Sequence, residues 1–235
     1  MTFQTSNPIL EVQDLTLTFG GVKALNGVSF AVAPGSITSV IGPNGAGKTS
    51  LIESIAGVLI PSAGTITMDD VNITKFSKRK RARSGLAVVE QGRMIFPSLT
   101  VKENLQLTAR TKADMDEALA LFPELEKRLN NQSILLSGGE QQMVVLARAF
   151  AAKPKYLLLD EMSLGLAPVV FMRLLPVIEG IAKSGVGVLL VEQFAHLALK
   201  IAQDSIVVTS GRVSYQGDPK ALLNDAELLR QKYMG

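Results

Sequence analysis

The sequence predicts an α/β fold built around a largely parallel β-sheet, and three observations support this. Two apolar runs, Tyr156–Asp160 and Gly187–Val191, have the length and unbroken hydrophobicity of strands that are buried on both faces. A third run, Ser39–Ile41, leads into a glycine-rich loop and then into a helix-compatible sequence. The start of the chain alternates apolar and polar residues with a period of two, which indicates additional antiparallel strands.

The segment before the glycine-rich loop is predicted to form an antiparallel layer. Leu10–Phe19 alternates with a period of two, Gly20 and Gly21 interrupt the pattern, and Val28–Val32 resumes it. After the loop, Gly64–Met68 fits a further strand of the same kind. Such strands bury one face and expose the other.

The glycine-rich loop Gly42–Thr49 matches the phosphate-binding pattern G-x-x-x-x-G-K-[ST] at every fixed position. Backbone N–H groups of such a loop surround a polyphosphate, and the following helix directs the positive end of its dipole toward it. Lys48 is predicted to reach the terminal phosphates and Thr49 to offer its hydroxyl to Mg²⁺. A glycine-rich turn with a chance Lys-Thr pair is the alternative, and the flanking strand and helix argue against it. The predicted ATP-binding set is Gly42, Pro43, Asn44, Gly45, Ala46, Gly47, Lys48, Thr49 and Ser50.

Two adjacent acids, Asp160 and Glu161, stand at the end of a predicted buried strand. Buried carboxylates are costly unless a metal ion or hydrogen-bond donors compensate them. In proteins with a phosphate-binding loop, an acid at this place holds the Mg²⁺ shell, and a neighbouring Glu can deprotonate the attacking water. A pair that only caps a helix is the alternative.

A second glycine-rich helix start lies at Ser137–Gly139 and opens a helix predicted to run to Ala152. Two glycines and a hydroxyl at a helix N-terminus form an anion site. Because Gly42–Thr49 already accounts for one phosphate site, this second one suggests an interface.

The remaining segments are predicted from their periodicity. Residues 74–84 read as a basic helix, Leu86–Val89 as a short strand, and residues 99–150 as helical with a break at Pro123. Helices are expected over 169–183, 195–202 and 218–233, and a hairpin over 205–217. The basic cluster Lys78–Arg81 is interpreted as a solvated helix face, with lipid headgroups or nucleic acid as the alternatives.

The composition adds weak constraints. The net charge of +3 is spread along the chain, and there is no cysteine for a disulfide or a thiolate metal site. Residues 1–19 lack the pattern of a signal peptide, and no apolar run has the length needed to span a bilayer.

The motifs together resemble the ATP-binding subunits of ABC transporters along essentially the whole chain. Leu136–Gln142 is similar to the family signature, which usually reads L-S-G-G-Q. The resemblance implies a P-loop NTPase with a RecA-like core sheet, an N-terminal antiparallel β-subdomain and an inserted α-helical subdomain. It also implies one ABC ATPase domain over residues 8–235, with the helical subdomain and the signature at about 92–150.

The same resemblance implies roles for individual residues. Phe19 resembles the aromatic residue that stacks on adenine, and Gln91 the glutamine that contacts Mg²⁺ and the membrane partner. Asp160 is expected to bind Mg²⁺ with Thr49 and Gln91, while Glu161 is expected to be the catalytic glutamate beside Lys48. In family dimers, Ser137, Gly138 and Gly139 of one protomer would close on the γ-phosphate held by the other.

The chain departs from the family pattern at several positions. The switch histidine is replaced by Gln193, which can donate to a phosphate but cannot carry a proton as imidazole can. The single histidine, His196, is interpreted as a helix-surface residue. Ala167 stands where the family usually has Asp, and Met162 where it usually has Pro.

Finer features resemble the second ATPase subunit of branched-chain amino-acid importers. These are the segments 92–97, 99–105, 160–168, 191–195 and 233–235. Urea and amide importers share many of them. The expected function is therefore ATP hydrolysis that powers amino-acid uptake, with ATP and Mg²⁺ as cofactors.

The expected partners are transmembrane permease subunits, a second ABC ATPase subunit in a hetero- or homodimer and, indirectly, an extracytoplasmic solute-binding protein. No nucleic acid is expected, and the predicted location is the cytoplasmic face of the membrane, as a peripheral subunit. Two alternatives remain: a soluble ABC ATPase that is not part of a transporter, and a nucleotide-binding subunit that hydrolyses poorly. The interval between Lys48 and Asp160 leaves no room for the long coiled coil of DNA-repair ATPases.

Overall fold

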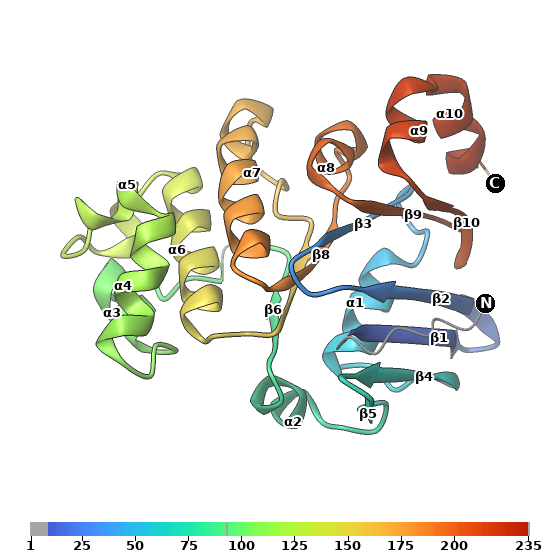
Figure 1. Cartoon of the computed structure of the whole chain (residues 1–235), viewed down its shortest axis with the longest axis horizontal. Coiled ribbons are helices and arrows are strands. Elements are labelled where there is room, and N and C mark those ends of the chain that lie inside the picture. Colours follow the sequence, from blue (N-terminus) through green and yellow to red (C-terminus); the bar gives the residue numbers. More distant parts are fainter. Residues whose placement is uncertain (1–8, 93, 235) are drawn as a thin grey trace.

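The computed structural model describes residues 9–92 and 94–234, and it contains two β-sheets surrounded by helices (Figure 1). The larger sheet has the strand order β10-β9-β3-β8-β7-β6, and the smaller one β2-β1-β4-β5. The larger sheet consists of β3 (Ile37–Ile41), β6 (Leu86–Val89), β7 (Tyr156–Asp160), β8 (Gly187–Val191), β9 (Asp204–Thr209) and β10 (Arg212–Gly217). The smaller consists of β1 (Leu10–Phe19), β2 (Val22–Val32), β4 (Ala63–Met68) and β5 (Val71–Asn72).

The pairing within the sheets confirms the predicted α/β class. In the larger sheet only β10 runs antiparallel to its neighbour, whereas every pair in the smaller sheet is antiparallel. The helices are α1 (Lys48–Ala56), α2 (Lys78–Arg83), α3 (Val101–Gln106), α4 (Lys112–Leu121), α5 (Pro123–Glu126), α6 (Gly138–Ala151), α7 (Pro168–Lys183), α8 (Ala195–Ile201), α9 (Pro219–Asn224) and α10 (Ala226–Met234). A single 3-10 turn, η1 (Ser133–Leu135), precedes α6 in the described chain.

The larger sheet separates two hydrophobic cores. Leu157 and Leu159 of β7 face a core shared with α6 and α7, whereas Leu158 faces a second core. Helix α1 contributes Leu51 and Ile55 to this second core, which also contains the inward residues of the smaller sheet. Because residues along a strand alternate between faces, unbroken hydrophobicity in β7 is what burial on both faces requires.

Helices α3–α6 lie together beside the larger sheet (Figure 1). The predicted helical stretch is divided into separate helices by its caps: Thr100, Thr111 and Ser137 each form a capping box at a helix start. Pro123 both ends α4 and occupies the first position of α5. We propose that this group is the helical subdomain at about 92–150. The division of the chain stays a prediction, and its limits 8 and 235, like Arg93 within the subdomain, lie outside the described residues.

Two predicted helices differ from those observed. The basic helix begins at Lys78 instead of residue 74, because the Ser77 side chain accepts a hydrogen bond from the Lys80 N–H and caps it there. The predicted C-terminal helix 218–233 is two helices, since Asp225 accepts from the Leu228 N–H at 2.9 Å and starts a new turn.

The basic cluster is only partly solvated. Arg81 is 1% exposed, so the expectation of a solvated face is wrong for this residue. Its guanidinium donates to the carbonyls of Ser54, Ile55, Thr74 and Phe76 at 2.6–3.0 Å. The first two belong to the last turn of α1, whose carbonyls have no partner within the helix. Arg81 therefore caps the helix that follows the glycine-rich loop.

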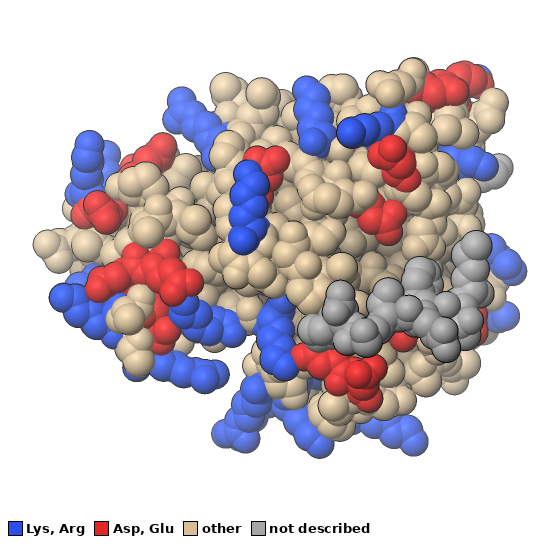
Figure 2. Space-filling model, viewed as in Figure 1, with Lys and Arg blue, Asp and Glu red and all other residues tan. Residues whose placement is uncertain are grey.

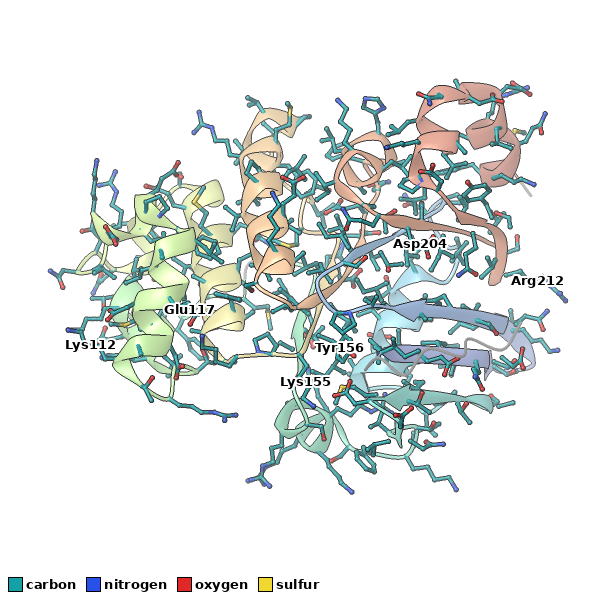
Figure 3. All side chains as sticks on the ribbon, in the orientation of Figure 1. Lys112, Glu117, Lys155, Tyr156, Asp204 and Arg212 are labelled. Carbon is teal, nitrogen blue, oxygen red and sulfur yellow. The ribbon has the colours of Figure 1, made fainter. Side chains whose placement is uncertain are left out.

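The start of β7, where Lys155 and Tyr156 are labelled in Figure 3, is joined to the smaller sheet by hydrogen bonds. The Tyr156 hydroxyl donates to Asp69 Oδ1 at 2.9 Å, and Lys155 Nζ donates to Asp69 Oδ2 at 2.5 Å. Asp69 lies in the turn between β4 and β5, so one carboxylate ties the smaller sheet to the larger.

On the face drawn in Figure 2, both basic and acidic side chains of the described residues are present. In the part of the chain that the structure describes, no helix combines the length and apolar character that a bilayer crossing needs.

Candidate active site

The glycine-rich loop connects β3 to α1 and is packed tightly from behind. A Cβ atom on Gly42 would lie 2.1 Å from the carbonyl oxygen of Val208, and one on Gly47 would lie 2.5 Å from that of Ala24. Gly47 also has a φ of +102°, which favours glycine. These two glycines are therefore required by backbone contacts with β9 and β2.

A second contact ties the loop to the hairpin of β9 and β10. The Gly211 N–H donates to the Ala46 carbonyl at 3.0 Å, and the Asn26 N–H donates to the Gly211 carbonyl at 2.8 Å. The loop is thus held from both the smaller and the larger sheet.

Lys48 lies almost fully buried at the centre of the loop, with 4% of its side chain exposed. Its ammonium donates to the carbonyls of Gly42 and Pro43 at 2.9 and 3.1 Å, and lies 3.6 Å from Glu161 Oε1. Lys48 therefore brings the loop and the predicted catalytic acid together.

Glu161 follows β7 directly and has a φ of +42°, an unusual value for a residue with a side chain. Its N–H donates to the Val191 carbonyl at 2.9 Å, which holds this backbone in place. Gln91 Nε2 donates to Glu161 Oε2 at 3.3 Å. The carboxylate is thus placed between Gln91 and Lys48.

Asp160 is 4% exposed, and within the described residues its Oδ1 atom has no hydrogen-bond partner. Burial raises the pKa of Asp160 to about 6; the charge of Glu161 acts in the same direction and that of Lys48 opposes it. Thr49, Gln91 and Asp160 are among the residues that line a further cavity. An unpaired carboxylate oxygen near a hydroxyl and an amide fits Mg²⁺, which prefers oxygen ligands and keeps several waters.

A cavity of about 470 Å³ brings most of the predicted residues together. It is lined by Ala24, Asn44, Gly45, Gly47, Lys48, Thr49, Ser50, Gln91, Glu161, Leu164 and Gln193. The family model for ABC transporters matches residues 25–163, which contain the loop, the signature and both acids. The chain belongs to the ABC transporter ATP-binding family.

Relatives of this ABC subunit match along its full length. It is 37% identical to the high-affinity branched-chain amino acid transport ATP-binding protein BraG of Pseudomonas aeruginosa, over 97% of this chain and 100% of that protein. It is 34% identical to the probable branched-chain amino acid transport ATP-binding protein LivF of Archaeoglobus fulgidus, over 92% and 94%. It is 32% identical to the lipopolysaccharide export system ATP-binding protein LptB of Escherichia coli, over 96% and 97%.

Solved ABC structures agree with this assignment. An ATP-binding cassette of an ABC transporter in its ADP conformation superimposes with a TM-score of 0.86 at 25% identity, covering 97% of this chain and 99% of that one. The cbiO1 subunit of the cbiONQ transporter complex of Clostridium perfringens gives 0.85 at 25% identity, over 96% and 94%. The subunit is therefore an ATPase with the P-loop fold predicted from its sequence.

Gln193, and not His196, lines the cavity beside the glycine-rich loop of this ABC subunit. Gln193 Nε2 donates to Asn44 Oδ1 at 3.0 Å, whereas His196 is exposed on α8 and is not among the residues that line the cavity. Met162, at the unusual position after Glu161, is buried in the core with α6 and α7.

Phe19 and the signature lie apart from this cavity within one ABC subunit. Phe19 ends β1 and is 49% exposed. Ser137, Gly138 and Gly139 line a different cavity of about 290 Å³, together with Gly165–Ala167. The Ser137 hydroxyl accepts from the Glu140 N–H, and Glu140 accepts from the Ser137 N–H at 2.8 Å. This capping box uses the glutamate that replaces the usual glutamine of the signature.

Sequence reasoning missed Ala24 and Leu164 in the cavity wall, and a buried acid, Glu192, next to Gln193. Ala24 and Leu164 are small or apolar and carry no chemical signal. Glu192 did carry a chemical signal, because an acid that directly follows a fully apolar strand is costly to bury without hydrogen-bond partners.

Proposed function

We propose that this ABC subunit hydrolyses ATP to power the uptake of branched-chain amino acids through a membrane permease. The observation that carries the proposal is the full-length match to BraG at 37% identity, combined with Lys48 and Glu161 at one cavity. Uptake of urea or amides, or of another amino acid, is the alternative within importers. The match to LptB adds export as a further candidate.

Nucleotide binding follows from the loop geometry. ATP would place its phosphates among the loop N–H groups, with the Lys48 ammonium at the terminal phosphates and Phe19 against adenine. Thr49, Asp160 and Gln91 would hold Mg²⁺, which neutralises phosphate charge and orients the phosphoryl group when bound. The unpaired Oδ1 of Asp160 supports this assignment.

Hydrolysis would use Glu161 as the general base that orients and deprotonates water. Its position between Lys48 and Gln91 supports that role. Gln193 would donate to the γ-phosphate from the opposite wall of the cavity, where it contacts Asn44. As an amide, it stabilises charge without exchanging a proton.

The separate cavity at Ser137–Gly139 supports a head-to-tail dimer. In such a dimer the signature of one subunit closes on the phosphates held by the other. ATP drives closure because the closed dimer makes contacts with the nucleotide that the open one lacks. We propose a second ABC subunit as the partner, a pair of permease chains at the cytoplasmic face of the membrane, and an extracytoplasmic binding protein that selects the solute.

The test is to purify the Glu161→Gln variant from native membranes with ATP and Mg²⁺, and to identify the bound proteins by mass spectrometry. This variant keeps the nucleotide-binding loop but slows hydrolysis, so the closed complex accumulates. Wild type prepared without nucleotide is the matched control.

Recovery of permease chains together with a solute-binding protein that binds branched-chain amino acids supports the proposal. Recovery of a urea or amide binding protein would show that the solute is urea or an amide. Recovery of lipopolysaccharide-export components would show that the subunit powers export and not uptake. Recovery of no membrane protein would overturn the transport assignment.

A further inference from the structure

Glu192 is a buried acid for which the proposed ATPase cycle has no role. It follows β8 directly and is 0% exposed. Among the described residues it forms no ion pair. Burial raises the pKa of Glu192 to about 7, against the effect of its hydrogen bonds. A carboxyl group kept at this cost needs an explanation.

Its hydrogen bonds come from two different loops. The Ser163 N–H donates to Glu192 Oε1 at 3.2 Å, and the Ser163 hydroxyl donates to Oε2 at 2.5 Å. The Gln193 N–H also donates to Oε2, at 3.3 Å. One carboxyl group therefore joins the loop after β7 to the loop after β8.

The loop after β7 borders both cavities, because its Leu164 lines the cavity of the P-loop, whereas the loop after β8 borders the cavity of the P-loop through Gln193. The loop after β7 continues through Gly165–Ala167, which line the cavity of the signature residues. Gln193 lines the cavity of the P-loop, where its side chain contacts Asn44. Through these hydrogen bonds the two oxygens of Glu192 fix the backbone of both loops at once.

We propose that Glu192 is a positioning residue for ATP hydrolysis. It holds Gln193 at Asn44 and couples that position to the loop 163–167 at the signature cavity. A carboxyl group suits this task because it accepts several hydrogen bonds with a fixed geometry between its oxygens. For stability alone, an apolar side chain of similar volume would serve as well or better.

The inference rests on the proposed role of Gln193 in hydrolysis. The experiment therefore separates the role of Glu192 from that of Gln193. ATPase rates and ATP affinity are measured for the subunit in its membrane complex, at pH 8, for Glu192→Met, Glu192→Gln, Gln193→Ala and the double variant Glu192→Met/Gln193→Ala. His196→Ala, an exposed neighbour outside the cavity, is the matched control, and Glu161→Gln is the inactive reference. Thermal unfolding checks that each variant is folded.

The expected result is a fall in kcat of about 10- to 100-fold for Glu192→Met, as for other small misplacements of reacting groups, with KM and ATP affinity within about twofold of wild type. Glu192→Gln should retain more activity, because its amide still bonds Ser163. The double variant should be no slower than Gln193→Ala, since Glu192 acts through Gln193.

Three outcomes would overturn the proposal. Wild-type kcat in Glu192→Met removes any positioning role, and a fully additive loss in the double variant shows an effect that does not pass through Gln193. Wild-type kcat in Gln193→Ala overturns the role of Gln193 itself and with it this inference. Full activity in Glu161→Gln would instead contradict the proposed hydrolytic mechanism as a whole.

Discussion

At the scale of single residues, the site is organised by three polar contacts around Glu161. Lys48 lies near its Oε1 atom and Gln91 donates to its Oε2 atom, while the Val191 carbonyl accepts from its backbone N–H. The φ of +42° is unfavourable for a glutamate by about 1–3 kcal/mol. The surrounding contacts keep this conformation, and the carboxylate consequently stays beside the P-loop without further rearrangement.

Substitution of Lys48 and Glu161 should separate binding from chemistry. Glu161→Gln is expected to lower kcat by about 100-fold or more while keeping ATP affinity, because only the base is lost. Lys48→Ala should weaken ATP binding as well, since it removes the cation at the phosphates. Equilibrium binding and steady-state ATPase assays measure both effects, with the exposed Lys200→Ala as control. Equal activity in all these proteins would contradict the proposed mechanism.

The pKa of Glu192 predicts a pH-dependent difference in stability. Because the folded pKa is raised from 4.5 to about 7, the folded state binds the proton more tightly than the unfolded chain. The stabilisation of the folded state by this proton is complete below about pH 4.5 and is lost as the pH rises through 7. Glu192→Gln lacks it, so the stability of the variant relative to wild type should increase between pH 5 and pH 8.

The size of this change is at most about 3 kcal/mol, from the 1.36 kcal/mol of each pKa unit. Urea unfolding of both proteins at the two pH values measures it. A stability difference that is the same at pH 5 and pH 8 would show that Glu192 does not titrate as described.

At the scale of elements, the P-loop helix α1 depends on a residue outside it. Arg81 reaches from α2 to the last carbonyls of α1 and also bonds two carbonyls of the connecting segment. Desolvation by burial lowers the pKa of Arg81 to about 10. The arginine is still charged at neutral pH and bonds only carbonyl groups, which carry the negative end of the α1 dipole.

Arg81→Ala is therefore expected to destabilise the fold by about 3 kcal/mol or more, because several buried carbonyls lose a charged donor. Arg79→Ala is the matched control: it removes an exposed arginine from the same helix and should change stability by no more than about 0.5 kcal/mol. Denaturant unfolding measures both. Similar losses in the two variants would contradict the capping role.

The elements also show what the sequence could predict. Strands β6, β7 and β8 lie where their apolar runs predict them, because burial on both faces leaves a strong and local signal. The start of α2 and the break between α9 and α10 depend on caps by Ser77 and Asp225, which compete with a continuous helical pattern. The buried state of Arg81 is a tertiary property and has no sequence signal within its basic cluster.

The same distinction applies to the site. The P-loop and Glu161 could be predicted because their chemistry is concentrated in short motifs. Their meeting with Ala24, Leu164 and Gln193 in one cavity depends on how three distant segments pack. The sequence indicates only that burial of Asp160 costs free energy. That its Oδ1 atom has no hydrogen-bond partner among the described residues is seen only in the structure.

At the scale of the whole molecule, the two predicted phosphate-binding features line separate cavities. The P-loop cavity contains Glu161 and Gln193, whereas the signature cavity contains Ser137 and Ala167. Under the proposed function, one subunit would present two half-sites, which is the arrangement that a head-to-tail dimer needs.

The proposed dimer makes a direct prediction. Glu161→Gln with ATP and Mg²⁺ should sediment as a dimer, and Ser137→Arg in the same background should remain monomeric while still binding ATP, because the bulky side chain blocks only the partner's phosphate. Lys127→Ala, an exposed change in the same group of helices, should dimerise normally. Analytical ultracentrifugation distinguishes these cases. Loss of ATP binding in Ser137→Arg would show that the signature acts within its own chain.

The place of β3 at the centre of the larger sheet has a consequence for biosynthesis. Its neighbours β8 and β9, and the Gly211 N–H that bonds the loop at Ala46, all belong to the last quarter of the chain. A ribosome makes the nucleotide-binding loop early, yet the strands that hold it are translated about 150 residues later. During translation the apolar β3 segment has no sheet to join, so the nascent polypeptide is most exposed to aggregation and to chaperones before its C-terminal hairpin emerges.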